Sequence, residues 1–273
     1  MCWDYISPRP WILDKLVLCD MLRLFVLSLT LTLALGQSNY CQQGLCSGGS
    51  THIACQNSGA WSASCPTSPA PYIIDMSQEL RELLVAAHNA RRNRLALGEL
   101  SGYSSARRMA LMRWNDELAS LAELNVKQCV RQRDACHNTD RFRNSGQNIA
   151  LFGYEGEAGA RTDQYLLKQA VTNWWQERDN ADMAVIDSYP SNWSGDSIER
   201  FALMAQQQNI ALGCAASRFF KNGLNQFLLV CNYAVNNVAG QPVYVSGPVG
   251  EGCQTGMNLN YPGLCKFAED FNI

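Results

Sequence analysis

Ten cysteines between residues 41 and 265 constrain the fold of this chain more than any other feature. The sequence contains twelve cysteines, and two of them, Cys2 and Cys19, precede an apolar N-terminal run. An even set of ten, grouped as four, two, two and two, is typical of five disulfides in an oxidising compartment, although the spacing itself leaves the pairing open. A zinc-thiolate site would need two facing pairs of closely spaced cysteines, and only Cys41 and Cys46 approach that spacing. The remaining ten are Cys41, Cys46, Cys55, Cys65, Cys129, Cys136, Cys214, Cys231, Cys253 and Cys265.

The N-terminal region has the parts of a secretory signal peptide. Residues 22–35 read LRLFVLSLTLTLAL after Met21, and Gly36 follows as a small residue suited to cleavage. The apolar run is shorter than the roughly 20 residues that cross a bilayer, so we expect no stable membrane anchor. Residues 1–20 are expected to be an upstream extension, because Met21 is the better start. We therefore predict a secreted, extracellular protein that begins near Gln37 after removal of residues 1–36.

Composition places the rest of the chain among globular proteins. Of its 273 residues, 47% are hydrophobic and 17% are charged, which is enough apolar material for a full core. The formal net charge is -2, and the sequence has no block of Lys and Arg. The chain is therefore expected to lack the basic surface that binds a phosphate backbone. Nucleic acid is therefore excluded as an expected partner.

Helical periodicity appears in four segments of the first two thirds of the chain. Ser77 precedes an amphipathic run that ends near Gly98, and Asn115 precedes a second run. A third helix is predicted from Thr162, with Trp174 and Trp175 expected to pack the core and line a cleft. A short fourth helix is predicted over 197–209.

Two strands are predicted near the C-terminus. Segments 210–217 and 226–235 read as antiparallel neighbours, which could place Cys214 beside Cys231. Residues 37–72 are rich in Gly, Ser, Asn, Pro and Cys and are expected to be irregular. Helices followed by strands indicate an α+β protein, with a three-layer α/β/α sandwich as its architecture.

Several segments, taken in order, resemble the CAP superfamily of secreted proteins. The resemblance is to its insect venom antigen 5 branch (allergen V5/Tpx-1-related proteins) and spans nearly the whole mature chain. The segments that carry it are NYCQQGLC, HIAC, ASCP, AHNARR, MRWNDELASLA, SGQNIA, NWWQER, IERFALMAQQQNIALGC, LVCNYAVNNVAGQPVY and CQTGMNLNYPGLC.

The resemblance implies a domain organisation and a disulfide plan. It implies a disulfide-rich segment over 37–76, a CAP domain over 77–245 and a C-terminal extension with a small cysteine hinge over 246–273. Bridges from the N-terminal segment would close long loops and so restrict the unfolded chain. The implied pairs are Cys41 with Cys55, Cys46 with Cys136, Cys65 with Cys129, Cys214 with Cys231, and Cys253 with Cys265.

Members of this family commonly carry two histidines and two glutamates in a central cleft, a set suited to a divalent metal. This sequence departs from that set. Arg133 and Arg200 stand at the histidine positions and Gln147 at the first glutamate position, so that only Glu177 is retained. A guanidinium offers no lone pair, and we therefore predict no metal or other cofactor in the cleft.

The four cleft residues allow two interpretations. Glu177 and Arg200 could form a structural ion pair, which we favour because such pairs are the commoner outcome. Alternatively, two arginines against one carboxylate would leave a surplus cation for an anionic ligand. Of the three histidines, His52, His88 and His137, we expect His88 to be structural, and only a shift of alignment would bring His137 to the cleft.

The predicted function is that of a secreted, non-enzymatic binding protein. The resemblance implies venom, saliva or reproductive fluids as settings and a small apolar or amphipathic ligand, such as a lipid or sterol, or an extracellular protein as partner. The alternative is an extracellular hydrolase or peptidase that uses the cleft, which the missing histidines disfavour. Asn192 in Asn-Trp-Ser is a predicted glycosylation site. We expect a monomer.

Overall fold

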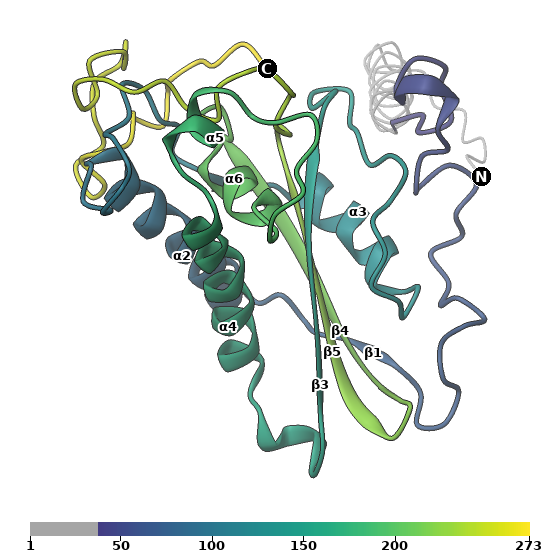
Figure 1. The fold of residues 1–273 in the computed structure, drawn as a ribbon. Coiled ribbons are helices and arrows are strands. Elements are labelled where there is room, and N and C mark those ends of the chain that lie inside the picture. Colours follow the sequence, from purple (N-terminus) through teal and green to yellow (C-terminus); the bar gives the residue numbers. More distant parts are fainter. Residues whose placement is uncertain (1–37) are drawn as a thin grey trace, which may run out of the picture. The chain divides into compact units, whose positions relative to one another are not determined.

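A five-stranded sheet forms the middle layer of the protein (Figure 1). The structure is a computed structural model and describes residues 38–273; the predicted signal peptide, Cys2 and Cys19 lie outside the described residues. The strand order is β1-β4-β5-β3, all antiparallel, while β2 pairs in parallel with β4. The strands are β1 (Tyr72–Ile73), β2 (Arg113–Trp114), β3 (Gly146–Tyr154), β4 (Ala211–Lys221) and β5 (Leu224–Tyr233).

The predicted hairpin is present and is longer than the sequence indicated. β4 and β5 pair over their whole length, with Cys214 directly opposite Cys231. Asn222 and Gly223 connect them with φ angles of 57° and 79°, a left-handed turn that matches the twist of antiparallel strands. The sequence did not predict β3. Its first five residues are buried on both faces of the sheet, so they lack the polar-apolar alternation that marks a strand.

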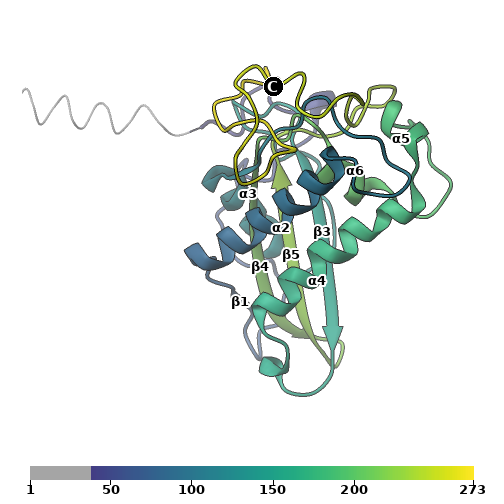
Figure 2. The same cartoon turned by 90° about the vertical axis from the view of Figure 1, so that its left-hand side faces the viewer.

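Helices cover both faces of the sheet, which confirms the α+β class and the three-layer sandwich (Figures 1 and 2). On β5, Phe227 and Leu229 pack against the layer of α2 and α4, whereas Leu228 and Val230 face the layer of α3. The helices are α2 (Gln78–Ala96), α3 (Asp116–Val126), α4 (Asp163–Gln176), α5 (Met183–Asp187) and α6 (Glu199–Ala205), with short 3₁₀ turns η1 (Ser47–Gly49), η2 (Ala158–Ala160) and η3 (Glu177–Asn180). None of the helices among residues 38–273 is long and apolar enough to span a bilayer.

The first three helices begin where their capping residues predict. The side chains of Ser77, Asn115 and Thr162 each accept a hydrogen bond from the backbone N–H three residues later. The predicted fourth helix corresponds to α6, which is shorter than the predicted span 197–209. It ends at Ala205, where the chain turns. The Asn209 side chain stabilises that turn by donating to the Leu203 carbonyl, 2.9 Å away, and accepting from the Val235 N–H, 2.8 Å away.

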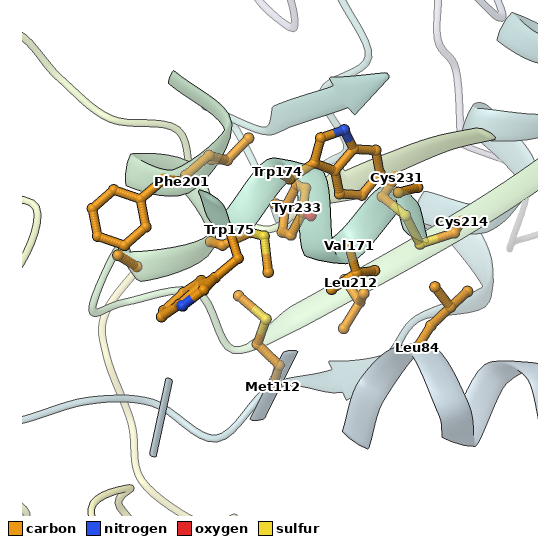
Figure 3. Close-up of a cluster of buried hydrophobic side chains, with 14 of the residues drawn as sticks. Leu84, Met112, Val171, Trp174, Trp175, Phe201, Leu212, Cys214, Cys231 and Tyr233 are labelled. Carbon is orange, nitrogen blue, oxygen red and sulfur yellow. A yellow bond between two sulfur atoms is a disulfide. The ribbon is translucent and has the colours of Figure 1, made fainter. Parts of the chain in front are cut away.

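The larger core lies between the sheet and the layer of α2, α4 and α6 (Figure 3). Trp174 and Trp175 are 2% and 4% exposed, as expected of core residues, and Trp175 contacts Phe201 edge to face at 5.1 Å. On the opposite face α3 lies directly on β4. A Cβ at Gly213 would stand 2.2 Å from the Ala119 backbone nitrogen, so a side chain there would push α3 off the sheet.

The structure contains the five disulfides that the family resemblance implies. Cys46–Cys136 and Cys65–Cys129 join the irregular N-terminal segment to the chain that follows α3. They close loops with sequence separations of 90 and 64 residues, which removes much freedom from the unfolded chain. Bridges of this kind stabilise by about 2–4 kcal/mol each.

Arg92 on α2 is fully buried and has only backbone carbonyls as hydrogen-bond partners. Its guanidinium donates to Ala110 at 2.8 Å, to Met204 at 2.7 Å and to Gln206 at 2.8 Å. The last two carbonyls belong to the end of α6 and the turn after it, where a cation also complements the helix dipole. Burial lowers the pKa of Arg92 to about 9, which still leaves it charged at neutral pH. This one side chain therefore connects α2, the segment before β2 and α6.

We expect Arg92→Met to lower the free energy of unfolding by roughly 3–5 kcal/mol, because it leaves several buried carbonyls without a donor. The matched control is Arg94→Met on the same helix, where the side chain is 63% exposed and the change should stay within about 0.5 kcal/mol. Denaturant unfolding of the disulfide-intact variants measures both. Equal, small effects would contradict the role given to Arg92.

Candidate functional site

Glu177 and Arg200, two of the four predicted cleft residues, form a direct ion pair. Glu177 lies in η3 at the end of α4, with its side chain 7% exposed, and Arg200 lies in the first turn of α6. The second carboxylate oxygen of Glu177 accepts from the backbone N–H of Arg200 at 2.7 Å and of Phe201 at 3.3 Å. The carboxylate thus satisfies N–H groups at the start of α6 as well as the guanidinium.

Arg133 does not face Glu177, contrary to the sequence interpretation that placed two arginines against one carboxylate. Its guanidinium pairs with Glu199 at 2.7 Å, and the two side chains are 52% and 56% exposed. Tyr189 lies beside these charges, and burial is the main cause that raises its pKa, followed by the Glu199 carboxylate. Each guanidinium therefore has its own carboxylate, and no surplus cation arises from these residues.

Gln147 lies on the side of the sheet that faces α3. Its side-chain nitrogen donates to Asp134 at 2.7 Å and to Asn232 at 2.9 Å, and its oxygen accepts from the Asp134 N–H. Burial raises the pKa of Asp134, and amide hydrogen bonds from Gln147, Asn125 and Gln128 oppose that rise. The structure thus places Gln147 in a buried amide-carboxylate network rather than beside Glu177.

The residues at the family's metal position do not fit a metal ion. Two of the four are guanidinium groups, which have no lone pair to give, and Gln147 is already engaged. Within residues 38–273 no three His, Cys, Asp or Glu side chains gather as a ligand set. Only Glu177 has the chemistry of a ligand, and it is neutralised by Arg200.

His88 connects α2 to strands β5 and β3 through a buried chain of hydrogen bonds. Its Nδ1 donates to the Leu84 carbonyl at 2.7 Å, and its Nε2 accepts from the Tyr233 hydroxyl at 2.8 Å, a tautomer assigned from this network. Asn148 donates to the same hydroxyl at 3.3 Å and to the Arg200 carbonyl at 3.1 Å. His88 thus helps to hold the backbone of Arg200 and has the structural role expected from the sequence.

The other two histidines lie toward the N-terminal segment. His137 is 8% exposed near His52 and Arg133, and burial lowers its pKa to about 4. His52 donates to the Asn138 carbonyl at 2.7 Å and accepts from the Ala54 N–H, so both of its ring nitrogens are engaged. His52 and His137 are 3% and 8% exposed, which disfavours either ring as a general base.

A groove that the sequence analysis missed lies between α2 and α4. It encloses about 430 Å³, and its apolar walls include Leu100 and Trp175. Three guanidinium groups border it, those of Arg91, Arg94 and Arg178. One signal was available in the sequence, since Arg91 occupies the apolar stripe of the α2 pattern, where a core residue would be expected.

Comparisons with known proteins agree with this fold. The model of the CAP family, described as the cysteine-rich secretory protein family, matches residues 85–233. Venom allergen-1 of Aedes aegypti is 33% identical over 84% of this chain and 88% of its own length. The antigen 5 like allergen Cul n 1 of Culicoides nubeculosus is 37% identical over 68% of this chain and 85% of its own. Tabinhibitin 3 of Tabanus yao is 29% identical over 85% of this chain and 87% of its own.

Solved structures show the same architecture. A crystal structure of NaASP2 with Zn²⁺ aligns with a TM-score of 0.57 and 22% identity over 74% of this chain and 100% of that one. The hookworm platelet inhibitor aligns with a TM-score of 0.53 and 17% identity over 74% of this chain and 95% of that one. The fold and the disulfides define a protein of the cysteine-rich, three-layer type. The chain belongs to the CAP family and is related to the insect venom allergens of the antigen 5 type.

We expect the stability of the protein to fall as the pH drops from 6.5 toward 4. Burial lowers the pKa of His88 to about 4, whereas an unfolded histidine protonates near 6.5. Between these values only the unfolded chain binds the proton, which costs the folded state about 1.4 kcal/mol per pH unit for this group. The variant His88→Gln should therefore show a shallower decline than the natural protein in denaturant unfolding at pH 7, 6, 5 and 4. If the stability of both proteins declines equally with falling pH, His88 is not the group responsible.

Proposed function

We propose that this protein is a secreted, non-enzymatic CAP protein that binds a small amphipathic molecule with an acidic head and an apolar body. The groove between α2 and α4 is the site that we assign to this ligand. The observation that carries the proposal is the environment of Arg91, a half-buried cation on the wall of an apolar groove. The relationship to insect venom allergens supports an extracellular setting.

Arg91 has neutral hydrogen-bond partners but no acidic one. Its guanidinium donates to the Ala87 carbonyl and to the Thr172 hydroxyl, each at 2.9 Å. Among the ion pairs of residues 38–273, Arg91 takes part in none. Burial lowers the pKa of Arg91, and the nearby Arg178 lowers it further. A ligand carboxylate in this groove would relieve that repulsion and form a charge-assisted hydrogen bond.

The rest of the groove suits an apolar body. Most of its exposed lining is apolar, with Leu100 and Trp175 on the walls and Ala90 at the surface of α2. A volume of about 430 Å³ lies in the range of sites for small ligands. An acidic lipid would place its chain along these walls and its head at Arg91.

The hydrolase alternative finds less support. The Glu177 carboxylate already binds Arg200 and two backbone N–H groups, and the buried rings of His88 and His137 have pKa values of about 4. Stoichiometric zinc together with peptidase activity that is lost in Glu177→Ala would overturn the non-enzymatic assignment.

Asn192 is proposed as a site of N-glycosylation in the secreted protein. It lies in the exposed segment 191–196, where a glycan would meet no packed side chains.

The test of the ligand site is calorimetric titration with dodecanoate below its micelle concentration. Arg91→Gln should weaken binding to this groove about tenfold, because it removes the positive charge that the ligand carboxylate would bind. Lys168→Gln on the exposed face of α4 is the control for net charge and should bind as the natural protein does. Equal affinities for all three proteins would contradict the assignment.

A further inference from the structure

Within residues 38–273, every charged side chain that lines the groove between α2 and α4 is cationic. The two helices lie side by side on one face of the sheet (Figure 2). Arg91 and Arg94 belong to α2, and Arg178 belongs to the 3₁₀ turn η3 that follows α4. Arg94 comes three residues after Arg91, which places both side chains on the same face of the helix. A ligand in this groove therefore meets three positive charges.

Two of these cations pair with carboxylates that hold them only loosely. The Nε atom of Arg94 lies 3.7 Å from a Glu99 carboxylate oxygen, and that of Arg178 lies 3.4 Å from Asp179, whereas a charge-assisted hydrogen bond measures about 2.7–2.9 Å. The Glu99 and Asp179 side chains are 53% and 67% exposed, and exposed pairs of this kind contribute little. Neither carboxylate lines the groove. These pairs therefore do not cancel the positive charge of the groove.

The charges on Arg91 and Arg178 also repel each other. Burial lowers the pKa of Arg91, and the charge of Arg178 lowers it further. A ligand carboxylate brings one negative charge against three positive ones. A phosphate monoester brings about 1.5–2 negative charges at pH 7 and three terminal oxygens that accept hydrogen bonds. Guanidinium groups match these oxygens in geometry, so a phosphate head suits this groove better than a carboxylate does.

We propose that the ligand of this groove is an apolar chain that ends in a phosphate monoester. This inference rests on the proposed function, because it names the head group at the same site. Arg91 is already oriented by the Ala87 carbonyl and the Thr172 hydroxyl, and it binds one phosphate oxygen. Arg94 and Arg178 supply the further positive charge that the second negative charge of the phosphate requires.

A second groove, on another side of α2, lacks this charge pattern. It lies between the first half of α2, strand β2 and the loop that the Cys253–Cys265 disulfide closes, and it encloses about 540 Å³. Val85 and Tyr261 are among the residues that line it. Side chains of both charge signs line it as well, including Arg81 and Glu82. We therefore expect a phosphate monoester to bind at one site in the protein.

The head group is tested by titration calorimetry at pH 8 with dodecyl phosphate and dodecanoate, each below its micelle concentration. The natural protein should bind one molecule of dodecyl phosphate, about tenfold more tightly than dodecanoate, because the phosphate brings a second charge. Inorganic phosphate has the charge but no apolar chain. It should bind at least about a hundredfold more weakly than dodecyl phosphate.

Two variants connect this preference to the cations of the groove. Arg178→Gln should reduce the preference for dodecyl phosphate over dodecanoate from about tenfold to about threefold or less. Arg94→Gln should reduce it in the same direction, and it is expected to fold normally because the Arg94 side chain is 63% exposed. Arg131→Gln is the matched control, since it removes the same charge at an exposed position beyond the end of α3. It should keep the full preference.

The outcomes separate the phosphate head from the proposed function. If the natural protein binds dodecyl phosphate and dodecanoate equally, the phosphate head is wrong and the proposed function stands. If it binds neither, or if inorganic phosphate binds as tightly as dodecyl phosphate, the proposed function is wrong as well. A preference that persists in both Arg178→Gln and Arg94→Gln would show that other residues bind the phosphate, and it would overturn the role given to these cations.

Discussion

The buried guanidinium of Arg92 is the interaction on which the rest of this structure depends. A cation without a carboxylate partner is costly to bury, and here carbonyls from the segment before β2 and from the end of α6 compensate that cost. One turn earlier on the same helix, His88 binds the Tyr233 hydroxyl and so reaches the sheet. Through these two polar side chains α2 is held in one orientation. Its remaining faces then border the two grooves.

The placement of α6 determines what the central cleft can do. The first turn of that helix carries Glu199 and Arg200, and the Glu177 carboxylate satisfies its N-terminal N–H groups. Where relatives could offer imidazole and carboxylate to a metal, this chain offers two separate carboxylate-guanidinium pairs. Such pairs hold neighbouring elements together but provide neither a Lewis acid nor a free base. The ligand site that we propose lies instead in the groove between α2 and α4.

Much of the fold could be predicted from local signals. Ser77, Asn115 and Thr162 mark helix starts because capping is a contact over three residues, and Asn222-Gly223 joins two apolar segments as a hairpin turn does. β3 was not predicted because its first half is buried on both faces. The early end of α6 was not predicted because Arg92, which is distant in sequence, and Asn209 bind the carbonyls of its last turn. Neither groove was predicted, because the walls of each come from residues that are distant in sequence. Arg91 meets Thr172, and Val85 faces the same groove as Tyr261, only once the layers are assembled.

The most direct measurement is a crystal structure of the protein grown with zinc and then soaked with dodecanoate. We predict the dodecanoate carboxylate at Arg91, its chain along Trp175, and the Glu177–Arg200 pair intact with no zinc bound to it. Zinc bound to Glu177 with Arg200 displaced, together with an empty groove between α2 and α4, would show that both the ion pair and the ligand site are wrongly assigned.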